Sequence, residues 1–118
     1  PEHEAWMRAL EELFRGVPLA EASRIVADGG VVIEAMGSGN AGAALVDAVA
    51  RACRRGVAVA ITSRVPGVRT GPTYGPGHDL VAAGAVMVPR LRAGQARVLL
   101  MAALGAGLPV DSTVSRWG

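Results

Sequence analysis

The sequence contains no lysine, a single cysteine and very few aromatic residues, and these shortages exclude several classes of function. Cys53 alone cannot form an internal disulfide, and with only His3 and His78 beside it the chain cannot build a cysteine-rich zinc site. No apolar run approaches the ~20 residues that a membrane-spanning helix requires. We therefore expect neither a structural metal nor a membrane anchor.

The positive charge is also too small and too scattered to indicate a nucleic-acid partner. All twelve cations are arginine, but the formal net charge is only +2, and aromatic residues for base stacking make up 3% of the chain. The densest group is Arg51, Arg54 and Arg55, which ends a helix-like segment before Gly56. Cations at that position complement the helix dipole, so a solvated helix end is the preferred interpretation.

The apolar pattern predicts an α/β fold class in a chain of 118 residues, which is long enough for one hydrophobic core. Apolar spacings of three and four predict helices, and short β-branched runs between glycines predict strands. The predicted order is helix 3–15, helix 18–28, strand 31–36, helix 41–55, strand 57–61, loop 65–79, strand 81–88 and helix 93–105. Strands that alternate with helices imply parallel strands joined by right-handed crossovers.

The same spacings predict which side chains of each helix face the core. In the first helix they are Trp6, Leu10, Leu13 and Phe14, and in the second Leu19, Ala22, Ile25 and Val26. In the third they are Leu45, Val46, Val49 and Ala52, and in the last Val98, Leu99, Ala102 and Ala103. Cys53 lies near the inner side of its helix, so we interpret it as a small buried hydrophobe rather than a nucleophile.

The glycine-rich turn at residues 37–42, Gly-Ser-Gly-Asn-Ala-Gly, follows a predicted strand and opens a predicted helix. Three interpretations remain open from these residues. The spacing fits a dinucleotide fingerprint, but the next strand ends in Thr62, Ser63 and Arg64 rather than in the acid that would bind a ribose. The turn can simply let helix and strand approach closely. Finally, Asn40 lies at the carboxyl end of a strand, where open α/β sheets bind ligands.

The long loop from Val65 to Asp79 is rich in glycine and proline and contains several hydroxyl and ionisable groups. Loops of this length in a small domain usually carry function or are disordered. His78 and Asp79 are neighbours in sequence, but that does not place a carboxylate on the imidazole. The spacing does not identify a nucleophile and its base, so a solvated loop is the preferred interpretation.

Five stretches in this order resemble the small C-terminal domain of bacterial-type L-asparaginases. They are residues 31–40, 55–64, 74–75, 79–85 and 96–101, and the resemblance extends over roughly residues 19–108. It implies a small Rossmann-like three-layer domain, with a short parallel sheet flanked by helices. Such a domain completes an active site that is formed mainly by the N-terminal domain of a neighbouring subunit.

The resemblance also implies the site residues and the partners. It assigns a substrate contact to Asn40, with Ser38 beside it in the motif, and leaves Arg64 and Tyr74 as candidates in the loop. The implied partners are an N-terminal catalytic domain or a neighbouring subunit, a small amide substrate and further copies of the chain in a homo-oligomer. No cofactor is implied, and with no export signal visible the expected compartment is the cytoplasm.

The chain departs from the family in ways that bear on activity. It has no lysine and lacks the N-terminal domain that carries the threonine nucleophile, so we predict that the chain alone is inactive. The loop at 65–78 has no acid, although some members place a glutamate there near the substrate amine. Residues 1–17 are predicted as a helix outside the family match, and residues 18–118 as the domain. A fragment of an amidohydrolase and a stand-alone dimerisation or docking module both remain open.

Overall fold

The computed structural model describes residues 22–27, 29–35, 42–63 and 75–118, together with Glu4, Arg8, Glu11, Glu12 and Arg15. Within these residues one sheet has the strand order β1-β2-β3-β4. The strands are β1 (Ala22–Ala27), β2 (Gly30–Ala35), β3 (Ala58–Ser63) and β4 (Val86–Met87). β2, β3 and β4 are parallel, and β1 is antiparallel to β2. The prediction of a short parallel sheet is confirmed, with β1 as an antiparallel edge.

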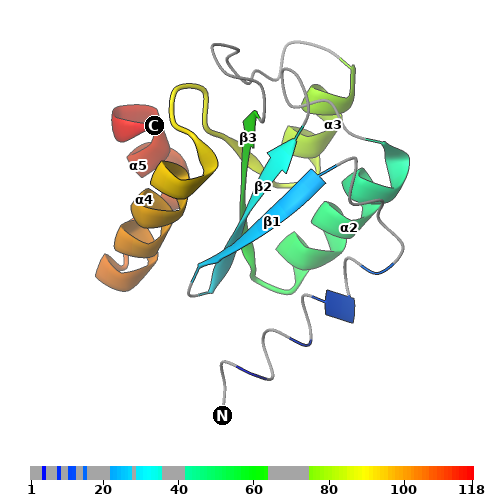
Figure 1. Cartoon of the computed structure of the whole chain (residues 1–118), viewed down its shortest axis with the longest axis horizontal. Coiled ribbons are helices and arrows are strands. Elements are labelled where there is room, and N and C mark those ends of the chain that lie inside the picture. Colours follow the sequence, from blue (N-terminus) through cyan, green and yellow to red (C-terminus); the bar gives the residue numbers. More distant parts are fainter. Residues whose placement is uncertain are drawn as a thin grey trace.

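Helices cover both faces of the sheet and give the three layers that the resemblance implies (Figure 1). On one face lie α2 (Ala43–Arg54) and α3 (Gly75–Ala82), and on the other lie α4 (Ala93–Ala106) and α5 (Val110–Trp117). α2 connects β2 to β3, and α3 connects β3 to β4. Successive parallel crossovers of one handedness must lie on the same face, as these two do.

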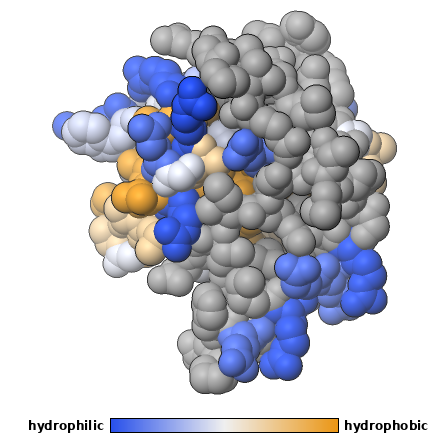
Figure 2. All heavy atoms as spheres, viewed as in Figure 1, coloured by the Kyte–Doolittle hydropathy of each residue, from blue (hydrophilic) through white to orange (hydrophobic). Residues whose placement is uncertain are grey.

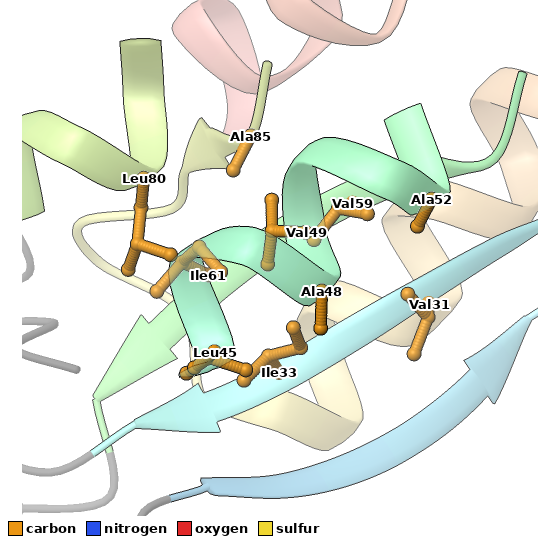
Figure 3. Packing of buried hydrophobic residues seen from close by; sticks show 10 residues of the cluster. All are labelled: Val31, Ile33, Leu45, Ala48, Val49, Ala52, Val59, Ile61, Leu80 and Ala85. Carbon is orange, nitrogen blue, oxygen red and sulfur yellow. The ribbon is translucent and has the colours of Figure 1, made fainter. Parts of the chain in front are cut away.

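The buried side chains divide into two clusters, one on each side of the sheet. Val31 and Ile33 of β2 pack toward α2, whereas Val32 between them packs toward α4, as strand alternation requires. Figure 3 shows the first cluster, in which Leu45 and Val49 of α2 lie over the strands. The predicted strands at 31–36 and 57–61 and the helix at 41–55 are thus confirmed, with small shifts at their ends.

The predicted helix at 18–28 is wrong, because residues 22–27 form β1. Ile25 pairs with Val32 and Val26 with Val31 across the turn at Gly29, whose φ of +77° suits glycine. Ala22, Ile25 and Val26 fit a helical spacing, but Ile25 and Val26 are β-branched. Pairing with β2 therefore outweighs the local pattern.

The predicted boundaries between 65 and 88 also need correction. Residues 75–79 were expected in a loop but belong to α3, and residues 81–82 end that helix rather than beginning a strand. β4 is only two residues long. Leu80 of α3 is fully buried in the cluster under α2, and this tertiary contact favours the helix despite Pro76 and its flanking glycines.

Helix 93–105 is confirmed as α4, and of its four predicted inner residues Leu99 and Ala103 do pack toward the core, whereas Val98 and Ala102 do not. The buried residues are Ala93, Ala96, Leu100 and Ala103, whereas Val98 is 62% exposed and Ala102 is also exposed. α4 is apolar on nearly every side, so the spacing alone cannot orient it. α5 was not predicted at all.

Part of the predicted N-terminal helix lies within the described residues. Glu4, Arg8, Glu11 and Glu12 are helical and exposed, and their spacing places them on one side of a helix. The four side chains predicted to face the core from this helix lie outside the described residues. No helix in the described ranges is long and apolar enough to cross a bilayer.

Candidate functional site

The parallel strands β2 and β3 end at the same level of the sheet. Glu34 is in register with Thr62, and Ala35 with Ser63, the last residue of β3. The segments 36–41 and 64–74 therefore leave the sheet from adjacent points, at the edge where the arrowheads of both strands lie in Figure 1. Open α/β sheets bind ligands outside the carboxyl ends of their strands, so this carboxyl edge is the candidate site.

The residues predicted for the site fall on these two segments. Ser38 and Asn40 belong to the first segment, Arg64 and Tyr74 to the second, and all four lie outside the described residues. What the structure adds is the position of the flanking elements. Ser63 and Gly75 delimit the second segment, and the first runs from Ala35 to α2. The two segments begin side by side, although neither is described itself.

Helix α2 begins two residues later than an asparagine cap at position 40 would require. Its N-cap is Gly42, whose carbonyl oxygen accepts hydrogen bonds from the N–H groups of Leu45 (3.1 Å) and Val46 (3.2 Å). Asn40 precedes this cap by two residues, so it is not the N-cap. Gly42 has no side chain to cap the helix, and the first turn carries no acid, which leaves the positive end of the helix dipole uncompensated by acidic side chains of that turn.

His78 and Asp79 are consecutive residues of α3, and the side chain of His78 lies outside what the structure describes. Asp79 is exposed, and its carbonyl oxygen accepts a hydrogen bond from the N–H of Ala83, as in any helix. The spacing identified no nucleophile and base among the loop residues, and the described part of α3 does not change that.

Cys53 is partly buried on α2 and packs against the core cluster on that face. Its Cβ and Sγ would each lie 3.0 Å from a Cβ added at Gly84. Burial raises the pKa of the Cys53 thiol, because the apolar surroundings disfavour the thiolate. A raised pKa is the opposite of what a nucleophilic cysteine needs, so the small-hydrophobe interpretation fits this position.

No group of three or more metal-ligating side chains occurs in the part of the chain that the structure describes. The most unusual polar group there is one that the sequence pattern did not single out as a site residue. Thr62 is fully buried, and its Oγ1 has no hydrogen-bond partner. Its strand, Ala-Val-Ala-Ile-Thr-Ser, ends in two hydroxyl residues, which is an ordinary pattern and does not mark Thr62 as a site residue.

Residues 26–115 match the family model of the glutaminase/asparaginase C-terminal domain. The chain belongs to this family. The match extends from the end of β1 into α5 and includes both segments of the candidate site, so the resemblance drawn from the five sequence stretches is confirmed. The match leaves out residues 1–25, and the predicted boundary between residues 17 and 18 stays a prediction. The candidate site therefore lies within the part of the chain that matches the glutaminase/asparaginase C-terminal domain.

Proposed function

We propose that this domain completes the active site of an asparaginase-like amidohydrolase, which converts L-asparagine to L-aspartate and ammonia. The observation that carries the proposal is the family match over residues 26–115, which favours a domain of an enzyme over a stand-alone docking module. The register of β2 with β3 supports it, because the segments with Asn40 and Arg64 begin side by side. In the proposal the nucleophile belongs to a catalytic domain outside this chain.

The chemistry at the carboxyl edge is binding rather than bond cleavage. Asn40 and Ser38 are proposed to contact the polar head of the substrate, and Arg64 and Tyr74 remain candidates for the same role. The chain has no lysine to activate a threonine, so the purified chain alone is expected to release no ammonia from asparagine or glutamine. Ammonia release that persists through repeated purification and exceeds a heat-killed control would contradict this.

Asn40→Asp tests the binding role in a complete enzyme that carries this domain. The substitution places a carboxylate beside the substrate, and Asn40 is not the N-cap of α2, so the fold has little reason to respond. We expect kcat/KM to fall about tenfold or more, while the melting temperature hardly changes. Asp47→Asn is the control, because it reverses the chemical change at an exposed position of α2. Unchanged kinetics in Asn40→Asp would remove Asn40 from the site.

Self-association of the chain, or instability when it is isolated, is the second part of the proposal. Val98 (62% exposed), Leu108 (53%) and Trp117 (62%) are large apolar side chains left open to solvent on or next to α4 and α5. Figure 2 shows orange, apolar residues on the side where Figure 1 places α4. Large exposed apolar patches mark interaction sites, and these side chains are the candidates for one here. A chain that is strictly monomeric in light scattering at micromolar concentration and that melts cooperatively would contradict this part. The proposed compartment is the cytoplasm.

A further inference from the structure

Two polar side chains lie next to each other on the α4 side of the sheet, at its carboxyl edge. Thr62 and Glu34 are partners in the register of β3 with β2. The residues two positions earlier, Ala60 and Val32, belong to the cluster under α4, so strand alternation directs Thr62 and Glu34 to that face as well. Neighbouring strands are ~4.8 Å apart, which puts a threonine hydroxyl within reach of a glutamate carboxylate by side-chain rotation.

The two groups differ in their access to water. Thr62 is 0% exposed and its Oγ1 has no hydrogen-bond partner, whereas Glu34 is only partly buried. A buried hydroxyl without a partner destabilises a fold, and such groups are rare in native proteins. The Thr62 hydroxyl is therefore a hydrogen-bond donor that is already out of water, and its neighbour Glu34 is only partly buried.

We propose that Thr62 is a positioning residue whose hydroxyl donates a hydrogen bond to the Glu34 carboxylate once a catalytic domain covers the carboxyl edge. This inference rests on the proposed function. Covering the edge removes water from Glu34, and a carboxylate that loses water needs a hydrogen-bond donor in its place. The Thr62 hydroxyl supplies that donor by rotating about its side chain, with no movement of the backbone.

The bond would act on the two strand ends that carry the candidate site. Glu34 lies two residues before the segment 36–41, and Thr62 lies two residues before the segment 64–74. A bond between them fixes the spacing of the strand ends in the assembled enzyme. The expected consequence is tighter substrate binding, which is measured as a lower KM at nearly unchanged kcat.

A double-mutant cycle tests the pair in the chain assembled with an asparaginase-type N-terminal catalytic domain. Thr62→Val removes the hydroxyl and keeps the shape, and Glu34→Met removes the acceptor and keeps the length. Each single variant is expected to lower kcat/KM about tenfold, chiefly through KM, and the double variant is expected to be no worse than either. Thr62→Ser, which keeps the hydroxyl, is expected to retain most of the activity.

In the chain alone, without the catalytic domain, Thr62→Val is not expected to be harmful. Because the bond is absent there, Thr62→Val should leave the melting temperature unchanged or raise it. Thr113→Val is the matched control, since the Thr113 hydroxyl already donates to the carbonyl oxygen of Pro109 at 2.7 Å. That variant should lower the melting temperature and leave kcat/KM unchanged.

Three results would overturn the proposal. The first is additive effects of Thr62→Val and Glu34→Met in the assembled protein. The second is a loss of stability in the chain alone that is as large for Thr62→Val as for Thr113→Val. The third is a coupling of Glu34 with Ser23, its partner in register on β1, in place of the coupling with Thr62. If the assembled wild-type protein hydrolyses no amide, the proposed function fails. In that case the Kd between the chain and the catalytic domain is measured for the same single and double variants. A coupling energy of zero between Thr62→Val and Glu34→Met in these Kd values would overturn this inference independently.

Discussion

Helices α2 and α4 cover opposite faces of one sheet, yet they meet the solvent in different ways. α2 buries Leu45, Ala48, Val49 and Ala52 and turns Asp47 and Arg51 outward as an ion pair. α4 buries Ala93, Ala96, Leu100 and Ala103, but its outer side carries Val98 and Ala102, and Arg97 is its one charged residue. The outer side of α2 is polar and suits contact with water, whereas the outer side of α4 has the apolar composition of a surface that a partner covers.

The two helices also differ in how closely they approach the sheet. α2 places large side chains against the strands, and Figure 3 shows Leu45 next to Ile33. α4 offers mostly alanine, and at Gly30 an added Cβ would lie only 2.9 Å from Cδ2 of Leu100. Gly30 thus permits a close approach of α4 to β2. The stability of the α2 face should therefore depend on large side chains that fill the space under the helix. The stability of the α4 face should depend on small residues, such as Gly30, that let the helix lie close to the sheet.

Leu45→Ala should have the largest effect, because Leu45 is fully buried under α2. We expect it to lower the free energy of unfolding by about 3 kcal/mol, through lost burial and the cavity left behind. The control Val98→Ala, on the outer side of α4, should change it by less than about 0.5 kcal/mol. Both values come from denaturant unfolding of the chain. Similar losses in the two variants would mean that α4 is covered on its outer side.

Gly30→Ala tests the close approach of α4. The new methyl group would also meet the carbonyl oxygen of Ala58 at 3.0 Å and Cδ1 of Leu104 at 3.1 Å, so it forces backbone or helix to shift. We expect a loss of about 1–3 kcal/mol in the free energy of unfolding. Gly105→Ala is the control, because an added Cβ there meets nothing within 4 Å, and it should gain up to about 1 kcal/mol. A neutral Gly30→Ala would contradict the packing described for this face.

Cys53 gives the α2 face a dependence on pH. Its pKa is raised in the folded chain, so the unfolded chain loses the thiol proton at lower pH than the folded chain does. The contribution to stability is complete below the ordinary thiol pKa and is lost as the pH rises through the folded value. Thermal unfolding across the alkaline range should show wild type losing stability relative to Cys53→Ala. Parallel curves for the two proteins would show that burial does not perturb the thiol.

Asp47→Asn should have the smallest effect. Asp47 pairs with Arg51 one turn later on α2, and both side chains are well exposed to solvent. Pairs of this kind contribute about 0.3–0.5 kcal/mol and are screened by salt. Denaturant unfolding at low and high salt should show a small loss that disappears at high salt. A loss above about 1 kcal/mol would mean that the outer side of α2 is not simply solvated.

The contrast between α2 and α4 also explains how much the sequence could predict. Asp47 and Arg51 among apolar residues fixed the orientation of α2, and its inner residues were largely predicted. In α4 no polar stripe marks the outer side, so the prediction also placed Val98 inward. For β1, the local pattern around Ile25 and Val26 fitted a helix as well as a strand. Only the pairing with Val32 and Val31 decided for the strand. Tertiary contacts of this kind are invisible to local spacing.

Less of the candidate site could be predicted. The carboxyl edge followed from the strands that precede the motif and the loop, and the structure confirms both strands, with β2 ending at Ala35 and β3 at Ser63. The roles of Asn40, Ser38, Arg64 and Tyr74 stay predictions. Thr62 escaped notice as a site residue because a single threonine at a strand end has an ordinary pattern. Only its complete burial, together with its unpaired Oγ1, makes it unusual.

The antiparallel direction of β1 determines where the preceding chain joins the domain. Ala22 begins β1 opposite Ala35, so the chain enters at the carboxyl edge, beside the point where the segment 36–41 leaves. A parallel first strand would have entered at the far edge, about 20 Å away for six residues. A catalytic domain joined upstream would therefore be attached at the carboxyl edge, beside the candidate site of its own chain. In an assembly of several copies, β1 would then hold that domain at a fixed place, from which it could face the site of a neighbouring subunit.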